Sequence, residues 1–201
     1  KEVPSIPFHD LSIVFYLFLV KDEHGQMTVL IRNDHLPIWN TDTSELYKLA
    51  IDNTPRLYPP CIRSMASLIN DMLFVNGTLI QPSFAAASPN ALDLTDSPIP
   101  LSILTNTSGI FGASAMLYPG VLKEFSKKIG HDLIILPSSV HEVLLLPYDS
   151  TYSFQEMADM VKDVNEKCVP VEEQLSNQVY YYSSAQDSIF LGGDPASRIL
   201  S

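Results

Sequence analysis

Basic residues are scarce in this sequence, and their scarcity narrows the range of partners. The chain has 12 Lys and Arg against 23 Asp and Glu, which gives a formal net charge of -11. A charge of this sign repels nucleic-acid phosphates and anionic lipid headgroups, so we expect neither nucleic acid nor a membrane as a partner. A protein or a small molecule is left as the partner class.

Cysteines are also few, and the spacing of the two that occur excludes the common metal and redox motifs. Cys61 and Cys168 lie far apart, and neither belongs to a CxxC pair. Thiols of this kind are typical of a reducing compartment, so the sequence predicts a cytoplasmic protein. The histidines lack the spaced histidine and carboxylate partners of a zinc site, and we therefore expect no metal and no cofactor.

Long apolar runs are absent as well. The longest, Leu11–Val20, is roughly half of the ~20 residues that a membrane-spanning helix needs. No basic stretch precedes this run and no small-residue cleavage site follows it, as a secretion signal would require. The run instead predicts a central β-strand that is covered on both faces.

The residues that are present predict one compact α+β domain, built from 201 residues. We expect a hairpin and helices in residues 1–80, a flexible, proline-rich loop in residues 81–100, and a second half in residues 101–201. The first part is expected to contain, in order, a strand at 11–20, its hairpin partner at 27–31, and helices that begin after Asn33 or Asp34, after Asp42 and at Cys61.

The order of elements in the second half is the clearest indication of the fold. Apolar periodicity predicts a strand at 101–105, a helical region at 112–129, strands at 132–136 and 143–146, a helix capped by Ser153, and strands at 179–182 and 188–191. This order is that of a split βαβ unit, for which a ferredoxin-like topology is one candidate. We therefore expect a mixed or antiparallel sheet with helices packed on it.

Polar side chains at the predicted hairpin turn 137–142 are the candidate catalytic residues. If this segment is extended, Ser139 and His141 lie on one face with Cα atoms about 6.6 Å apart, as a nucleophile and its base require. Ser138 is the alternative nucleophile. Glu142 then points to the opposite face and cannot orient the histidine, and no G-x-S-x-G elbow is present. The competing interpretation is a structural turn whose serines bind loop amides.

A second candidate site is the segment between a predicted strand and a predicted helix, where amides at a helix start often bind anions. Asn106, Ser108 and Gly109 are the candidate ligand-binding residues, for an anion or a substrate carboxylate. The segment lacks the third glycine of the dinucleotide fingerprint and the Gly-Lys-Ser/Thr ending of a P-loop. Close packing of Gly112 and Ala113 against a sheet is the competing explanation for the small residues.

Several short segments form an ordered set over nearly the whole chain: Asn33–Trp39, Glu45–Ala50, Asn53–Leu57, Leu104–Asn106, Tyr118–Leu122, Leu136–Val143, Val164–Glu166 and Leu175–Asn177. Together they resemble an uncharacterised bacterial family, catalogued as domain of unknown function 5688 and found mostly in gut Firmicutes. The resemblance implies a cytoplasmic bacterial protein with a further N-terminal region ahead of the matched part. It implies no activity and no catalytic residue.

Two functions are compatible with these observations. The first is a binding or regulatory domain that recognises a protein or a small ligand through residues 81–100 and the turn at 137–142. The second is a hydrolase or transferase that uses Ser138 or Ser139 with His141. Because the chain opens at Lys1 and runs almost directly into an apolar strand, we also expect contact with a missing N-terminal region, or self-association.

Overall fold

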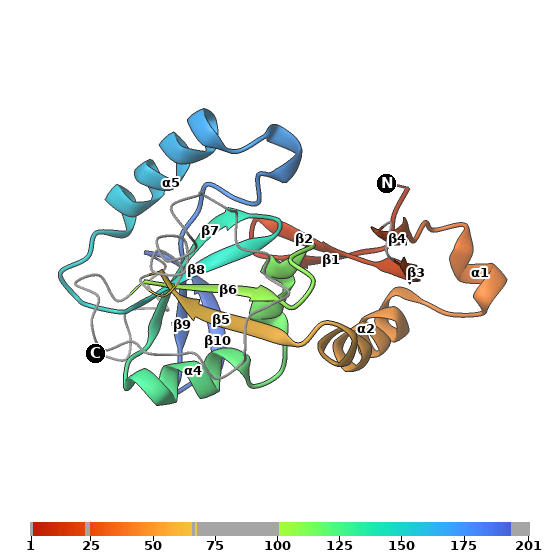
Figure 1. The fold of residues 1–201 in the computed structure, drawn as a ribbon, viewed down its shortest axis with the longest axis horizontal. Coiled ribbons are helices and arrows are strands. Elements are labelled where there is room, and N and C mark those ends of the chain that lie inside the picture. Colours follow the sequence, from red (N-terminus) through yellow and green to blue (C-terminus); the bar gives the residue numbers. More distant parts are fainter. Residues whose placement is uncertain (1, 23–24, 66, 68–100, 194–201) are drawn as a thin grey trace, which may run out of the picture. The chain divides into compact units, whose positions relative to one another are not determined.

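A computed structural model describes residues 2–22, 25–65, 67 and 101–193, which Figure 1 draws as a coloured ribbon. The chain divides into two compact units, Lys1–Leu57 and Tyr58–Ser201. Both contain helices and antiparallel strands, which confirms the α+β class. The predicted loop at 81–100 lies outside the described residues, as do the predicted boundaries on either side of it. No helix in the described part is both long and apolar enough to cross a membrane.

The described residues of the first unit form two hairpins and two helices. Its elements in chain order are β1 (Ser5–Phe8), β2 (Leu11–Val14), β3 (Tyr16–Asp22), β4 (Gly25–Leu30), α1 (His35–Trp39) and α2 (Thr43–Leu57). Strand β1 pairs with β2, and β3 pairs with β4, both antiparallel. Helix α2 begins where the sequence predicts, because the Asp42 carboxylate accepts a hydrogen bond from the Glu45 N–H at 2.8 Å.

The longest apolar run does not form the single, fully covered strand that its pattern predicts. The chain breaks at Phe15, between β2 and β3, and Phe15 joins Ile31 and Leu46 in a small core. Leu17 and Val29 lie directly opposite each other in β3 and β4, and they are 42% and 41% exposed. The prediction was wrong because, in the part of the chain that the structure describes, β3 forms a two-stranded sheet with β4, and these facing side chains of the sheet stay partly exposed.

In its described residues, the second unit contains a six-stranded antiparallel sheet with the strand order β10-β9-β7-β8-β6-β5. These strands are β5 (Pro60–Ser64), β6 (Ser102–Asn106), β7 (Leu133–Ser139), β8 (Glu142–Pro147), β9 (Tyr180–Ser183) and β10 (Ser188–Leu191). The described helices of this unit include the 3-10 helix η2 (Gly112–Leu117), α4 (Val121–Ile129), α5 (Phe154–Cys168) and the 3-10 helix η3 (Val171–Glu173).

Strand β5 corrects the prediction of a helix that begins at Cys61. Apolar residues at three-and-four spacing suggested that helix, yet Cys61 pairs with Thr105 and Ile62 pairs with Leu104 in an antiparallel ladder. The pairing partner, β6, is distant in sequence, so a local pattern carries no information about it. The rest of the predicted helix lies almost entirely outside the described residues.

The predicted split βαβ unit is present, and the order of its strands explains where the helices lie. Strands β6 and β7 are connected through α4 with β8 between them, and β8 and β9 are connected through α5 with β7 between them. Both connections cross the sheet in the same direction, but their strands run in opposite directions. Two right-handed crossovers then place α4 and α5 on opposite faces, as Figure 1 shows. In a ferredoxin-like sheet the last strand pairs instead with the first strand of the unit, and the helices share one face.

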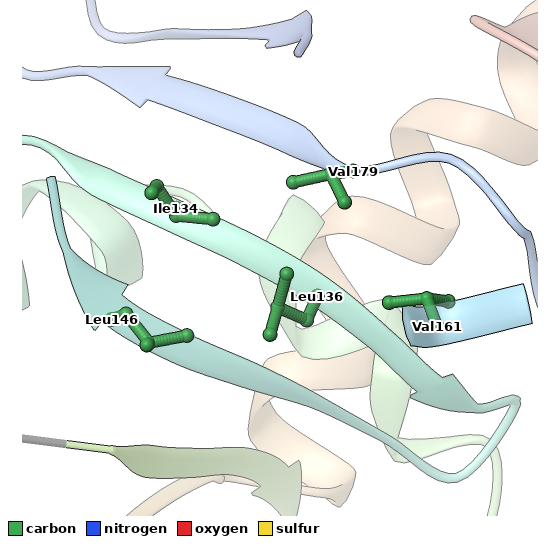
Figure 2. Packing of buried hydrophobic residues seen from close by; sticks show 5 residues of the cluster. All are labelled: Ile134, Leu136, Leu146, Val161 and Val179. Atoms are coloured by element: carbon green, nitrogen blue, oxygen red, sulfur yellow. The ribbon is translucent and has the colours of Figure 1, made fainter. Parts of the chain in front are cut away.

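The core fills both faces of β7, which explains the continuous apolar run in this strand. Figure 2 shows the cluster on the α5 side, which consists of Ile134, Leu136, Leu146, Val161 and Val179. The alternate residues of the same strands point to the other face and are also fully buried, namely Leu133, Ile135, Val143 and Leu145. Because the β7–β8 hairpin is buried on both faces, it forms a rigid scaffold for the turn at its end.

Candidate functional site

The turn at 137–142 joins β7 to β8 and contains an irregularity. A shift of register between Pro137 and Ser139 places Ser138 in a β-bulge. Pro137 is tolerated in a central strand because the pairing of β7 with β9 ends at Ile135, so the missing amide does not interrupt that ladder. The bulge and the turn therefore replace the extended geometry assumed from the sequence.

Three separate elements hold the backbone of this turn. The Ala113 N–H in η2 donates to the Val140 carbonyl at 3.3 Å, and the Val140 N–H donates to the Glu173 carbonyl in η3 at 2.8 Å. The Thr105 hydroxyl at the end of β6 donates to the His141 carbonyl at 2.8 Å. Groups that a free turn would leave to water are thus bound by β6, η2 and η3, and the turn has a fixed position.

The two candidate nucleophiles use their hydroxyls for other contacts. Ser139 Oγ accepts a hydrogen bond from the backbone N–H of His141 at 3.0 Å, and Ser138 Oγ donates to Glu142 Oε1 at 3.3 Å. Both contacts are those of a structural turn. In the part of the chain that the structure describes, no hydrogen bond joins either serine hydroxyl to the His141 imidazole.

The imidazole of His141 is instead bound by the Phe111 backbone and lies near Glu173, and no sequence motif identifies either residue. The Phe111 N–H donates to His141 Nδ1 at 3.2 Å, so the neutral ring carries its proton on Nε2. Nε2 lies 3.9 Å from Glu173 Oε1, which is beyond hydrogen-bonding distance. The rings of Phe111 and His141 stack with their centroids 6.0 Å apart and an interplanar angle of 20°. We refer to Phe111, His141 and Glu173 as the turn cluster.

Gly112 is required because η2 passes very close to the turn. A Cβ at this position would lie 2.1 Å from Thr105 Oγ1 and 2.4 Å from the His141 carbonyl oxygen. Ala113 and Ala115 are also buried. The small residues of this segment therefore serve close packing of η2 against the sheet, as one of the two interpretations of the sequence predicts.

The candidate ligand-binding residues bind one another in this structure. Asn106 Oδ1 accepts hydrogen bonds from the Ser108 N–H at 3.0 Å, the Ser108 hydroxyl at 2.9 Å and the Gly109 N–H at 2.9 Å. Asn106 Nδ2 donates to the Ile110 carbonyl at 3.0 Å. The buried Asn106 side chain thus closes the loop between β6 and η2 on itself.

The segments that build the turn cluster contain no basic residue. Residues 101–118, 133–149 and 168–184 lack Lys and Arg altogether, whereas η3 contributes Glu172 and Glu173. The Asp, Glu, Lys and Arg residues of these three segments are therefore all acidic, and charge of this sign attracts cations. Among the described residues, no group of three or more His, Cys, Asp and Glu is arranged to hold a metal ion.

A second polar network lies at the opposite end of the β7–β8 hairpin. The Asp132 carboxylate accepts hydrogen bonds from the Tyr181 hydroxyl, from the Ser184 N–H at 2.9 Å and from the Ser184 hydroxyl at 2.6 Å. Burial opposes ionisation of Asp132, but these hydrogen bonds outweigh it and hold the pKa of Asp132 below its usual value. Tyr182 donates to Asp187 at 2.7 Å, and burial together with this carboxylate raises the pKa of Tyr182. The tyrosines of β9 are buried and pack within the sheet.

Comparison with known proteins gives a family and no activity. The model of a family described as a family of unknown function (DUF5688) matches residues 1–184, a range that includes the whole turn cluster. No curated protein matches the chain, and no solved structure matches it.

Proposed function

Because the chain belongs to the DUF5688 family, we propose a function from the geometry of its turn cluster: a binding or regulatory domain that recognises its partner at the β7–β8 turn. The observation that carries this proposal is a contrast between two sets of groups. The serine hydroxyls and backbone groups of the turn are engaged in holding it, whereas His141 and Glu173 keep side chains that are 34% and 44% exposed.

Rigidity of the turn supports recognition. A surface that is already ordered loses little conformational entropy when a partner binds, so more of the interaction energy appears as affinity. Binding residues often lie on loops that a rigid scaffold positions, and here the scaffold is a hairpin buried on both faces. An aromatic ring, an imidazole and a carboxylate offer a partner both apolar and polar contacts.

Selection from a library of displayed random peptides tests the proposal on the folded chain. We expect enriched peptides to lose at least about tenfold in affinity, about 1.4 kcal/mol, when His141 is replaced by alanine. His131→Ala is the matched control, because His131 is exposed near the other end of the hairpin, and binding to this variant should not change. Peptides that bind equally to the parent and to His141→Ala would contradict the proposal.

An enzyme is the second candidate function, and one observation favours it. Glu173 lies beside His141 Nε2 and supplies the carboxylate that Glu142 cannot. In a hydrolase or transferase, Ser138 or Ser139 would be the nucleophile and His141 the base, but His141 Nδ1 would first have to release the Phe111 N–H.

A fluorophosphonate probe distinguishes the enzyme from the binding domain, because it labels only activated serines. We expect no labelling of Ser138 or Ser139, since neither hydroxyl donates to the imidazole. Labelling of either serine that disappears in His141→Ala would support the enzyme and contradict a purely binding role.

The cytoplasm is the location that we propose, on the basis of cysteine chemistry. Cys61 is buried, Cys168 is exposed, and both are free thiols. An exposed free thiol is typical of a reducing compartment. Fractionation of bacterial cells that produce the tagged chain tests this, and recovery in the periplasm or the medium would contradict it.

A further inference from the structure

We propose that the turn cluster binds a basic side chain, the lysine or arginine of a peptide partner. Glu173 is the charged contact, and the rings of Phe111 and His141 form the surface on which the cation lies. This inference rests on the proposed function, because it names the ligand chemistry of the same site.

Glu173 is positioned to accept a hydrogen bond from such a ligand. Its carbonyl is fixed by the Val140 N–H at 2.8 Å, so the residue is attached to the turn. Its side chain is 44% exposed, and its Oε1 atom lies 3.9 Å from His141 Nε2. Among the described residues no hydrogen bond reaches this carboxylate, and its oxygens keep their acceptor capacity. A guanidinium or ammonium group is the donor that forms the strongest hydrogen bonds with it.

The ring surface beside Glu173 is fixed before any ligand arrives. The Phe111 N–H is bound to His141 Nδ1, and the two rings stack. Phe111 has a φ of 51°, a left-handed conformation that a bulky residue adopts only at a cost and only where its surroundings hold it. A cation within about 6 Å of an aromatic centroid is attracted by the ring, and arginine in particular stacks on such faces.

The charge of the surroundings selects a cation over an anion. The three segments around the cluster lack Lys and Arg, and the whole chain has a net charge of -11. This field attracts a basic partner and repels an acidic one. The loop at Asn106 is the other candidate site, and it has few donors left for an anion. Asn106 Oδ1 already accepts hydrogen bonds from the backbone N–H groups of Ser108 and Gly109.

Two short peptides with blocked termini test the inference by NMR titration of the full chain. One carries an arginine between glycines, and the other carries citrulline, which is neutral and nearly isosteric with arginine, in the same position. We expect the arginine peptide to shift the signals of Phe111 and His141 saturably. The citrulline peptide should bind at least about tenfold more weakly, as loss of a charged hydrogen bond implies.

Glu173→Gln should weaken binding of the arginine peptide by about tenfold as well. Glu124→Gln is the matched control, because Glu124 is an exposed acid in the first turn of α4 and its loss changes the net charge equally. Binding to Glu124→Gln should stay within about twofold of the parent, since exposed charges at a distance are screened.

Three results would overturn the inference: equal binding of arginine and citrulline peptides, equal losses in the two glutamine variants, or no shift at the cluster. Its failure is distinguishable from failure of the proposed function. If displayed peptides depend on His141 but contain no basic residue, the binding domain stands and the cationic ligand is wrong. If displayed peptides bind the parent and His141→Ala equally well, the proposed function itself is wrong.

Discussion

Replacement of Gly112 by alanine should destabilise the second unit by about 3 kcal/mol, because the added methyl group has no space. Its Cβ would lie 2.1 Å from Thr105 Oγ1, 2.4 Å from the His141 carbonyl oxygen and 2.9 Å from the Asn106 backbone nitrogen. Two of these three atoms belong to the backbone, so rotation of a side chain cannot relieve the contacts. Either β6 or the turn must move away from η2.

The magnitude follows from three contributions. Overpacking of a well-packed site costs about 1–3 kcal/mol, and contact with two backbone atoms favours the upper end. Displacement of Thr105 also breaks its hydrogen bond to the His141 carbonyl, which is worth about 1 kcal/mol. Alanine gives the unfolded chain less conformational entropy than glycine does, and this offsets about 0.7 kcal/mol of the destabilisation. The sum is about 3 kcal/mol.

Gly130→Ala is the control that separates lack of space from backbone conformation. Gly130 has a φ of +75°, and in the described part of the chain nothing lies within 4 Å of its added Cβ. Alanine there should cost only about 1–2 kcal/mol, from the left-handed backbone alone.

Urea unfolding with amide hydrogen exchange in β6 and β8 measures both variants. Fluorescence of Trp39 is unsuitable, because this residue lies in the first unit. If Gly112→Ala costs no more than Gly130→Ala, the reasoning from close approach is refuted.

Three further substitutions test the polar contacts of the second unit. Asp132→Asn should lower the stability of the chain at neutral pH, because folding depresses the pKa of Asp132. The stability that the ionised carboxylate contributes is present above about pH 4 and is lost as the pH falls through the pKa of the folded state. The stabilities of parent and variant should therefore converge in acid, and a difference that stays constant across the pH range would contradict this. Ser153→Ala removes the acceptor of a 3.3 Å hydrogen bond from the Glu156 N–H at the start of α5, and it should destabilise this helix by about 1 kcal/mol. Amide hydrogen exchange in the first turn of α5 should become faster, and unchanged exchange would argue against capping. Tyr182→Phe removes the bond of 2.7 Å to Asp187 and should lower stability by about 1–2 kcal/mol in thermal unfolding, whereas the more exposed Tyr152→Phe should have little effect.

Elements with strong local signals were predicted from the sequence. The hairpin of β7 and β8 has two apolar blocks separated by a polar turn, and α5 has the Ser153 cap before its apolar stripe. The small residues from Gly112 onward also indicated close packing correctly. In each case the information lies within a few neighbouring residues, so no knowledge of distant partners is needed.

Elements that depend on distant partners were predicted wrongly. Strand β5 exists because β6 pairs with it, and the apolar spacing after Cys61 points to a helix when that partner is unknown. A local rule can fail as well: a proline disfavours helix in the residue before it, which favours a helix end near Thr54, yet α2 continues to Leu57 with Pro55 inside its last turn. A proline so close to the end disturbs few further helical bonds, which explains why the helix passes it.

The candidate site was predicted only in part for the same reason. The turn and His141 were identified from a local pattern. Glu142 contacts Ser138 and not the imidazole, but the extended geometry from which its exclusion was predicted is replaced by a bulge and a turn. Phe111 and Glu173 lie far from His141 in sequence and reach it through η2 and η3. Neither residue has a neighbour that marks it as functional, so only the three-dimensional arrangement reveals the turn cluster.

The central claim is that the turn cluster is a recognition surface. An NMR map of the chain with one selected peptide tests it most directly, by comparing amide shift changes over both units. The account predicts that the largest changes fall on Phe111, His141 and Glu173. Largest changes elsewhere in the chain, with the signals of these three residues unmoved, would contradict it.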